Sequence, residues 1–469
     1  MSKDTDAMKE ILERQREAFL TAPAPDVAQR REALARLEKV IRKHRDDFCD
    51  AISSDFGNRS RHETVAAELF LVLESIRQAR SKVRKWTASE RRPTSLAFLP
   101  GRSMIMYQPL GCVGVISPWN YPVQLALGPM TGALAAGNRI MLKPSELTPL
   151  TSELLKQSLG EVFGEEEIAV VTGGPEVGRA FSGLPFDHLL FTGAPSIGSL
   201  VMKAASVNLV PVTLELGGKS PAIVAPDYSL GRAANAIAFG KLFNAGQTCI
   251  EPDYAFVPAG TRDSFVEHVR RQVAAMYPTL ADNPDYTSII SDRHFARITA
   301  LVEDARSKGA RIIELNPASE DLSGTGKMVP LVVLDVTEDM ALMQEEIFGP
   351  VLPIMEYERE ADAIDYVQRH PRPLALYYFS DDRTSVENML SRTISGGVSV
   401  NDTFLHVAQE ELPFGGVGTS GMGCYHGEYG FRTFSHRKSV FFQRRPNAID
   451  LVRPPYGGTI DKLMKLLIG

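Results

Sequence analysis

One cysteine of this chain stands where a nucleophile could work. Cys249 ends the stretch FNAGQTC, residues 243–249, which surrounds its sulfur with small residues and side-chain amides. A cysteine nucleophile needs access and polar neighbours that stabilise negative charge, and this stretch provides both. The alternative is a small buried hydrophobe, which is the usual state of a single cysteine. The stretch alone leaves both interpretations open.

Two glutamate positions could supply a general base. Glu215 lies in TLELGGK, directly before a Gly-Gly turn, and Glu345 and Glu346 lie in MQEEIFGP. A carboxyl group in an apolar segment is costly to bury unless it is paired or used. Burial raises its pKa toward neutrality, which suits a base. For each glutamate the alternative is a surface turn.

A glycine-containing stretch could bind an anion. FTGAPSIG, residues 191–198, follows a strand-like run and opens a helix-like one. Gly193 and Gly198 would let backbone N–H groups approach a phosphate at a helix N-terminus, where the helix dipole favours negative charge. A tight turn that needs glycine conformations explains the stretch equally well.

Several common motifs are absent or incomplete. GGKS at 217–220 resembles the end of a phosphate-binding loop, but Thr213 stands where that motif needs glycine. The chain contains no H-E-x-x-H, no G-x-S-x-G and no G-x-G-x-x-G after a strand. No cluster of cysteine and histidine has metal-ligand spacing, so we expect no metal site.

The elements that position these residues are of α/β type. Residues 5–90 show the three-to-four-residue apolar period of long helices. Two β-rich runs around Leu110-Gly111 indicate a hairpin, and from Pro118 strand-like and helix-like segments alternate, which predicts a parallel sheet with helices on both faces. A second α/β stretch begins near residue 210, and a strand near 438–445 could pair with the early hairpin.

Composition limits the function classes. The chain has 469 residues, 44% hydrophobic, with a net charge of −6, which predicts a soluble protein of two or three domains. The charge gives no reason to expect nucleic acid or anionic membrane as a partner. The four cysteines have no paired spacing, which suits a reducing compartment. Since there is no signal peptide and no long apolar run, we expect a cytoplasmic location.

Seven motifs in order resemble the aldehyde dehydrogenase superfamily. They are PWNYP (118–122), KPSE (143–146), FTGAPSIG (191–198), ELGGKSP (215–221), GQTC (246–249), EEIFGPVLP (345–353) and PFGGVGTSGMG (413–423). The resemblance spans about residues 5–445. It is closer to the class 3 branch, and CIEPDY, PRPLALYYF and GMGCYHG resemble the bacterial coniferyl aldehyde dehydrogenases of that branch.

The resemblance implies a catalytic set. Cys249 would attack the aldehyde and form a thiohemiacetal that becomes a thioester after hydride transfer. The side-chain amide of Asn120 and the backbone N–H of Cys249 would form the oxyanion hole. Glu215 would activate the water that hydrolyses the thioester. Glu346 is the rival base, although in the family it more often holds the nicotinamide ribose.

The resemblance also implies a cofactor, NAD. Lys143 and Glu146 correspond to the pair that contacts the ribose hydroxyls; the carboxylate disfavours a 2′-phosphate, while Lys143 leaves NADP use open. The family's T-G-S is here Thr192-Gly193-Ala194, which shifts phosphate binding to backbone amides and Ser196. The full set of expected cofactor contacts is Pro118, Trp119, Lys143, Glu146, Thr192, Gly193, Ser196, Ile197, Gly198, Leu216, Gly217, Glu346 and Phe348.

The family fold implies a Rossmann-type cofactor domain (1–102 and 119–212), an α/β catalytic domain (213–402), and an oligomerisation arm with a C-terminal segment (103–118 and 403–469). Such an arm favours a homodimer. Tyr121, Phe243 and Phe404 line the expected tunnel and favour an aromatic or medium-chain aldehyde. The alternatives are a CoA-acylating enzyme and a non-enzymatic binding protein on the same fold.

Overall fold

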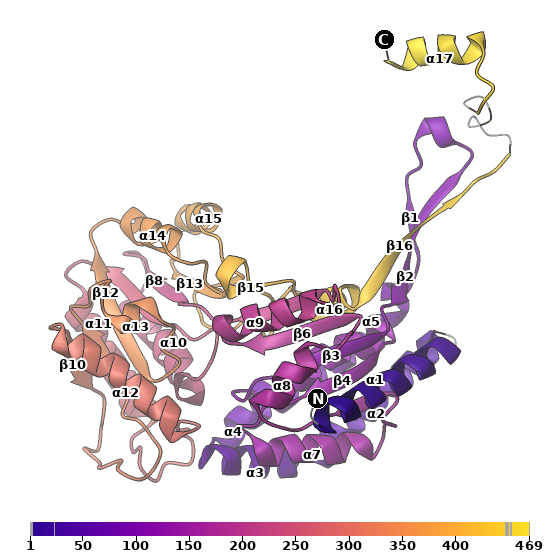
Figure 1. The fold of residues 1–469 in the computed structure, drawn as a ribbon. Helices are drawn as coiled ribbons and strands as arrows, with labels where there is room; N and C mark the ends of the chain where they lie inside the picture. Colours follow the sequence, from indigo (N-terminus) through magenta and orange to yellow (C-terminus); the bar gives the residue numbers. More distant parts are fainter. Residues whose placement is uncertain (1–2, 23, 446–449, 451–452, 469) are drawn as a thin grey trace.

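The computed structural model describes residues 3–22, 24–445, 450 and 453–468 and places their strands in three sheets (Figure 1). The first is a six-stranded sheet of order β15-β7-β6-β3-β4-β5. Neighbouring strands run parallel, except that β15 is antiparallel to β7. Its strands are β3 (Cys112–Ile116), β4 (Arg139–Lys143), β5 (Ile168–Val170), β6 (His188–Gly193), β7 (Val212–Leu216) and β15 (Gly421–Met422).

Helices cover both faces of this sheet because its central strands are apolar on both sides. All five residues of β3 are buried, and they alternate between two cores: Cys112 packs in one, Val113 and Val115 in the other. The Cys112 face carries α1 (Lys3–Thr21), α8 (Pro175–Ser182) and α9 (Pro195–Ser206). The opposite core includes α2 (Val27–Lys43), α3 (Arg45–Phe56), α5 (Leu71–Trp86), α6 (Gln124–Ala136), α7 (Pro149–Gly160) and α16 (Gly427–Thr433).

The second sheet has seven strands in the order β10-β11-β12-β9-β8-β13-β14. They are β8 (Pro221–Val224), β9 (Tyr254–Pro258), β10 (Arg311–Glu314), β11 (Leu331–Leu334), β12 (Val351–Tyr357), β13 (Ala375–Phe379) and β14 (Gly397–Val400). One face packs on α10 (Leu230–Leu242) and α11 (Arg262–Met276). The other packs on α12 (Asp292–Ser307), α13 (Ala341–Gln344), α14 (Glu360–Arg369) and α15 (Arg383–Arg392).

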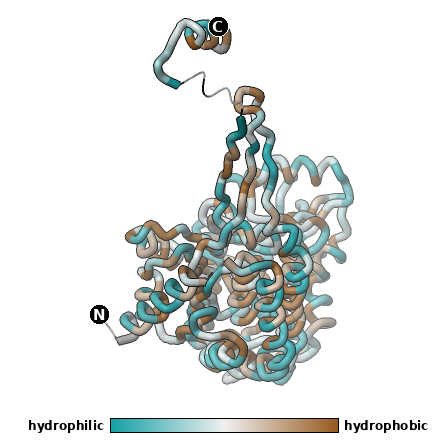
Figure 2. The backbone as a smooth tube through the Cα atoms, turned by 90° about the vertical axis from the view of Figure 1, so that its right-hand side faces the viewer, coloured by the Kyte–Doolittle hydropathy of each residue, from teal (hydrophilic) through white to brown (hydrophobic). Residues whose placement is uncertain are grey.

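A three-stranded arm projects from the body (Figures 1 and 2). It consists of β1 (Glu90–Arg92), β2 (Arg102–Pro109) and β16 (Ser435–Phe442), with β2 in the middle of two antiparallel pairs. Its apolar tip exposes about half or more of several large side chains, namely Leu96, Phe98, Leu99, Phe441 and Phe442. Helix α17 (Gly458–Ile468) follows. Within the described residues, no helix is both long and apolar enough to cross a membrane.

The predicted hairpin of residues 103–118 is wrong. Its first run is β2 of the arm, but its second run is β3, which pairs with β4 and β6 in the middle of the six-stranded sheet. The reason lies in burial, since β3 is buried throughout whereas β2 is largely half-exposed. Leu110-Gly111 therefore connects two sheets instead of closing a hairpin.

Other expected boundaries also shift. The boundary at residue 213 falls inside β7, which pairs with β6, so the first strand of the second sheet is β8. β1 lies within the expected cofactor segment 1–102 but belongs to the arm sheet, and β15 lies within 403–469 but joins the six-stranded sheet. The expected pairing of the C-terminal strand with the early arm strand is confirmed as β16 with β2.

Candidate active site

The predicted site residues come together at the carboxyl edge of the six-stranded sheet. The chain runs from β3 outward to β4 and β5, then returns with β6 on the other side of β3. Loops after β3 and β6 therefore leave in opposite directions and open a crevice, which is where ligands bind in open α/β sheets. Asn120 follows β3, Lys143 ends β4, Thr192 lies near the end of β6, and Glu215 lies near the end of β7.

Cys249 is presented by an unusual turn after α10. Asn244 and Ala245 have positive φ angles of 53° and 52°, and Gly246 follows with 74°. A Cβ on Gly246 would lie 2.4 Å from the carbonyl oxygen of Gly349, so only glycine fits there. Left-handed backbone in residues other than glycine is strained and concentrates at functional sites. The turn thus directs the following residues back over the sheet edge.

Gln247 fixes the turn to its surroundings. Its amide nitrogen donates to the carbonyl oxygens of Asn244 and Ser288, both at 3.0 Å, and its side-chain oxygen accepts from the backbone N–H of Ile290 at 2.9 Å. The side-chain nitrogen and oxygen of the buried Gln247 are thus both hydrogen-bonded, which makes the loop rigid. The amides that the sequence showed around Cys249 therefore hold the loop in position.

Asn120 reaches the cysteine loop directly. Its side-chain nitrogen donates to the carbonyl oxygen of Gln247 at 3.1 Å, and only 3% of Asn120 is exposed. Its backbone oxygen accepts from Arg59 Nη1 at 2.8 Å and from Asn244 Nδ2 at 3.1 Å. The side-chain amide of Asn120 is therefore held next to Gln247, which precedes Cys249 by two residues in the chain. This fixed position suits a hydrogen-bond donor to a developing oxyanion.

Behind Asn120 lies a buried ion pair that the sequence analysis missed. Arg59 Nη1 lies 2.9 Å from Glu68 Oε1, and both side chains are fully buried. Glu68 also accepts from the backbone N–H groups of Val123 and Gln124 at 2.7 and 3.1 Å. Its helical turn, Val65–Phe70, is a π-helix, which often marks functional sites. The pair ties the loop after β3 to the N-terminal helices.

Removing one partner should destabilise the protein strongly. Arg59→Met leaves the Glu68 carboxyl buried without its counter-charge, so we expect the free energy of unfolding to fall by about 3–5 kcal/mol. Urea denaturation monitored by circular dichroism measures the loss. The double variant Arg59→Met, Glu68→Gln should regain part of it, because the amide oxygen can still accept from Val123 and Gln124. A loss below about 1 kcal/mol in the single variant would contradict this role.

Glu215 is a buried carboxyl group without a partner. Only 2% of it is exposed, and neither carboxyl oxygen makes a hydrogen bond. Burial raises its pKa well above the ordinary value. Its charge acts on Cys249, Cys424 and Tyr425, which places it beside the cysteine loop. An isolated carboxyl in such a position is costly unless it is used, and a raised pKa suits a general base.

Glu346 approaches the site from the second sheet. Its carboxyl accepts from the backbone N–H of Gly218 at 3.2 Å, and a Cβ on Gly217 would lie 2.0 Å from its oxygen. Burial raises the pKa of Glu346 to about 8. Two residues on, Phe348 has a φ of 53° and packs edge-on against Trp119, with ring centroids 5.5 Å apart. Phe348 thus meets the loop that carries Trp119, and Glu346 meets the turn after β7.

The surroundings of Cys249 disfavour its thiolate form. Burial raises its pKa, and the carboxyl groups of Glu346 and Glu215 raise it further, while its own backbone N–H partly offsets them. A nucleophilic role therefore requires proton removal within the site. Glu346 and Glu215, the two predicted bases, have the larger charge effects on the sulfur, and Glu251 adds a smaller one.

Two buried acids hold this region and were missed as site residues. Glu251 pairs with Lys241 at 3.0 Å and accepts from the backbone N–H of Phe348 at 3.1 Å. Asp253 pairs with Lys219 and accepts from the N–H of Ile347 at 2.9 Å. They fasten the Glu346 loop to the cysteine loop. The available signal was CIEPDY, where two acids follow Cys249 within an apolar context.

The crevice fits a dinucleotide. Helix α9 begins without a side-chain cap; Pro195 has no N–H and Ile197 donates to Ala194, which leaves the N–H of Ser196 to face a phosphate. The Thr192 hydroxyl is buried and unpartnered. A Cβ on Gly198 would lie 2.6 Å from Leu216, so glycine allows α9 to pack closely on the sheet. Ser196 and Ile197 are exposed in the first turn of α9, and Pro118 and Gly193 are half-exposed at the same edge.

Lys143 and Glu146 form an ion pair at the end of β4. Lys143 Nζ lies 2.8 Å from Glu146 Oε2, with Lys143 buried and Glu146 exposed. The structure thus brings together the pair that the sequence assigned to a ribose. No group of three or more histidine, cysteine, aspartate or glutamate side chains within the described residues is placed to hold a metal ion.

Aromatic side chains border the cysteine loop. Phe243 and Phe404 lie with ring centroids 5.8 Å apart, and Phe239, which the sequence analysis did not select, meets them at 5.3 and 6.3 Å. Tyr121 is buried; its hydroxyl lies 2.7 Å from the Thr248 hydroxyl, and the Arg59 guanidinium lies 4.7 Å from its ring. The first three form an apolar entrance, whereas Tyr121 also supports the loop.

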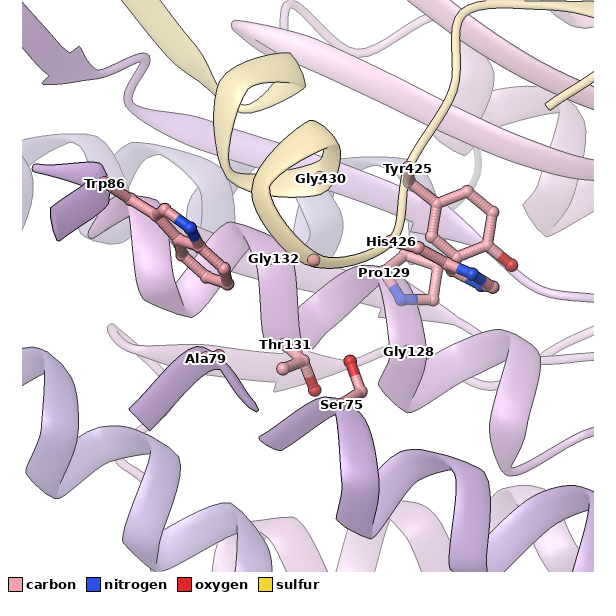
Figure 3. A pocket seen from close by; sticks show the side chains of 11 residues that line it. Ser75, Ala79, Trp86, Gly128, Pro129, Thr131, Gly132, Tyr425, His426 and Gly430 are labelled. Atoms are coloured by element: carbon pink, nitrogen blue, oxygen red, sulfur yellow. The ribbon is translucent and has the colours of Figure 1, made fainter. Parts of the chain in front are cut away.

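A small cavity lies on the inner side of the site, between α5, α6 and α16 (Figure 3). Tyr425 and His426 lie at one side of it with Pro129 beside them, and Trp86 lies at the other side. Cys249, Asn120 and Glu215 do not line it. The cavity is therefore separate from the proposed reacting centre, although Tyr425 borders both.

The comparisons with known proteins identify the family. The profile described as "Aldehyde dehydrogenase family" matches residues 1–440. The chain belongs to the aldehyde dehydrogenase family. It is therefore an NAD(P)-dependent aldehyde dehydrogenase, and the α/β fold expected from the sequence is confirmed.

Two named relatives and one solved structure align with nearly the full length of this chain. The chain is 50% identical to a "Probable coniferyl aldehyde dehydrogenase" of Pseudomonas aeruginosa, over 98% of this chain and 96% of the relative. It is 48% identical to a "Coniferyl aldehyde dehydrogenase" of a Pseudomonas species, over 97% and 95%. The structure titled "Substrate bound state of Staphylococcus Aureus AldH" superposes with a TM-score of 0.92 at 38% identity, covering 98% of this chain and 99% of that one.

Proposed function

We propose that this aldehyde dehydrogenase oxidises apolar aromatic aldehydes of the coniferyl aldehyde type to carboxylic acids. The observation that carries the proposal is the meeting of Cys249, the Asn120 amide and the unpartnered Glu215 carboxyl at one sheet edge, beside the Phe239, Phe243 and Phe404 cluster. The similarity to two coniferyl aldehyde dehydrogenases supports the substrate class.

The residues divide the reaction as follows. The sulfur of Cys249 bonds to the aldehyde carbon, and the oxygen that becomes negative accepts hydrogen bonds from Asn120 Nδ2 and the backbone N–H of Cys249. The bound nicotinamide supplies the hydride acceptor. Glu215 takes a proton from the water that cleaves the resulting thioester, and the buried position of its carboxyl keeps it basic near neutral pH.

We assign the cofactor crevice to NAD in preference to NADP. The adenosine side would meet the Lys143–Glu146 pair, whose carboxylate can accept from ribose hydroxyls but repels a 2′-phosphate. The first turn of α9 and Thr192 would hold the phosphates. Glu346 and Phe348 would contact the nicotinamide half, together with Trp119 and Leu216.

We further propose a cytoplasmic homodimer. The β1–β2 connection and the end of β16 expose an apolar tip, which a second copy could cover by pairing along an edge strand. The domain division expected from the sequence, adjusted so that β7 stays with the cofactor sheet, remains a prediction.

The proposal predicts a ranking of substrates. With NAD, kcat/KM should be higher for cinnamaldehyde-type and benzaldehyde substrates than for succinic semialdehyde, because the Phe239, Phe243 and Phe404 cluster offers apolar surface to the substrate. NADH production over a panel of aldehydes measures it, with NADP as the parallel cofactor. A higher kcat/KM for succinic semialdehyde would overturn the substrate class, and a higher kcat/KM with NADP would overturn the cofactor assignment.

A further inference from the structure

Three buried polar atoms lie without a hydrogen-bond partner near the site. They are the Tyr425 hydroxyl, Nδ1 of His426 and Nε2 of His406. The Gln124 side chain approaches the Tyr425 hydroxyl without reaching hydrogen-bonding geometry. An unpaired buried polar atom destabilises the fold, so a group of them indicates a missing partner.

The three side chains gather in one place. The rings of Tyr425 and His426 pack edge-on with centroids 4.7 Å apart, and Figure 3 shows the two side chains projecting side by side from the loop before α16. Phe414 stacks on His426 at 5.2 Å. The His406 imidazole interacts electrostatically with that of His426, so it approaches from the neighbouring loop.

This cluster borders the catalytic cysteine. The charges of Glu215 and Cys249 both act on the Tyr425 phenol. His406 follows Phe404 of the aromatic entrance by two residues, and its ring lies 6.1 Å from that of Tyr377. The Tyr377 hydroxyl in turn donates to the carbonyl oxygen of Ile250, next to Cys249. An aldehyde bound at the sulfur therefore has this polar cluster beside it.

The chemistry of the cluster suits a neutral hydroxyl. Burial lowers the pKa of His406 and of His426 to about 4, so both imidazoles are uncharged at neutral pH. Nδ1 of His406 already contacts the Ser399 hydroxyl at 2.8 Å, which leaves Nε2 free for a ligand. Uncharged rings and a phenol can donate to and accept from a hydroxyl, but they cannot balance a carboxylate.

His426 is also held in a backbone conformation that histidine seldom adopts. Its φ is 89°, in a chain where nearby positive angles belong to glycine, such as Gly423 and Gly427. Such strain persists where the surroundings over-determine a residue, and it concentrates at ligand sites. The imidazole is therefore kept at this point against the local preference of the backbone.

We propose that Tyr425, His426 and His406 bind the ring hydroxyl of a 4-hydroxycinnamaldehyde-type substrate whose carbonyl lies at Cys249. The inference rests on the proposed function and assigns the residues that recognise the 4-hydroxyl group of coniferyl aldehyde-type substrates. A site built to pair with a substrate hydroxyl rejects the analogue that lacks it, since its own polar groups then stay unpaired. Wild type should therefore favour the hydroxylated aldehyde by about tenfold or more in kcat/KM.

The test compares 4-hydroxycinnamaldehyde, 4-methoxycinnamaldehyde and cinnamaldehyde in wild type and matched variants. Tyr425→Phe removes only the hydroxyl. His426→Gln has a carbon instead of a polar atom at the position of Nδ1. His426→Asn keeps a polar atom there, and asparagine tolerates a positive φ. His406→Asn keeps the contact to Ser399 but loses Nε2. The readout is the ratio of kcat/KM between hydroxylated and unsubstituted substrate, which a general loss of stability does not change.

We expect this ratio to fall by about fivefold or more in Tyr425→Phe, His426→Gln and His406→Asn, and to stay closer to wild type in His426→Asn. The methoxy compound should behave like cinnamaldehyde or worse. A wild-type ratio near one, or a ratio that none of the variants changes, would overturn the inference while leaving the proposed oxidation of aromatic aldehydes intact. Failure of wild type to oxidise any of the three would instead overturn the proposed function.

Discussion

Replacing Cys249 by alanine is expected to lower kcat by about 10⁴-fold or more, since the sulfur that bonds to the aldehyde carbon is gone. NADH production with NAD and cinnamaldehyde measures the loss. Cys249 and Cys424 lie on different loops, so this variant leaves Cys424 in place.

The control for this experiment is Cys424→Ala. Cys424 also feels the charge of Glu215, but its chain position follows β15 and it has no assigned contact with the substrate. It should keep activity within a few-fold of wild type. Activity that survives Cys249→Ala and disappears in Cys424→Ala would reassign the nucleophile.

Glu215→Gln should separate the two halves of the reaction. Formation of the thioester does not need the base for water, so one equivalent of NADH per site should appear in a rapid burst. Steady-state turnover should then fall by about 10²–10⁴-fold, the usual contribution of a general base. Stopped-flow measurement of NADH gives both phases. A variant that keeps full turnover, or one without a burst, would exclude Glu215 from thioester hydrolysis.

The pH dependence distinguishes the two glutamates. The pKa of Glu215 is raised by burial and that of Glu346 to about 8, and a base works only when deprotonated. Hydrolysis should therefore accelerate as pH rises through the raised pKa of the working base. We expect Glu346→Gln to keep this rise and to weaken NAD binding, and Glu215→Gln to lose it. Addition of CoA tests the acyl-transfer alternative, because CoA would restore turnover without the base.

Residue types marked Cys249 and Glu215 as candidates, and the resemblance to the family assigned their roles. Cys249 and Glu215 stood out because a polar, small-residue loop and a carboxyl in an apolar strand are both unusual unless used. The structure brings them to one sheet edge with Asn120, and the electrostatic effect of Glu215 on Cys249 agrees with that placement. Their roles stay predictions until the variants are measured.

The supporting residues could not be predicted in the same way. Arg59 lies in the loop after α3 and Glu68 in the helical turn Val65–Phe70, both about 50–60 residues before Asn120 in the chain, and only tertiary packing joins them to Asn120. In the sequence, Glu251 and Asp253 resemble ordinary surface acids. Only the fold places Lys241 beside Glu251 and Lys219 beside Asp253. The local sequence does not show which residues pair over such a distance. It shows only that a carboxyl group within an apolar run costs free energy to bury unless it has a partner.

The error at 103–118 has a similar origin. CVGVI has the composition of any β-strand, and its distance from SMIMYQP fits a hairpin. The segment CVGVI is buried on both faces, as is typical of a central strand in a parallel sheet, and this burial decides its position. A continuous apolar run without alternation was the available signal, and it outweighs the Leu110-Gly111 turn signal.

The most direct test of the central claim is mass spectrometry of Glu215→Gln after mixing with NAD and 4-hydroxycinnamaldehyde. We predict an adduct on the peptide that contains Cys249, with the mass of the aldehyde less two hydrogen atoms, as a thioester requires. Cys249→Ala, Glu215→Gln should carry no adduct. An acyl group on any other residue, or an unmodified enzyme that still produces NADH, would contradict the assignment of Cys249 as the nucleophile.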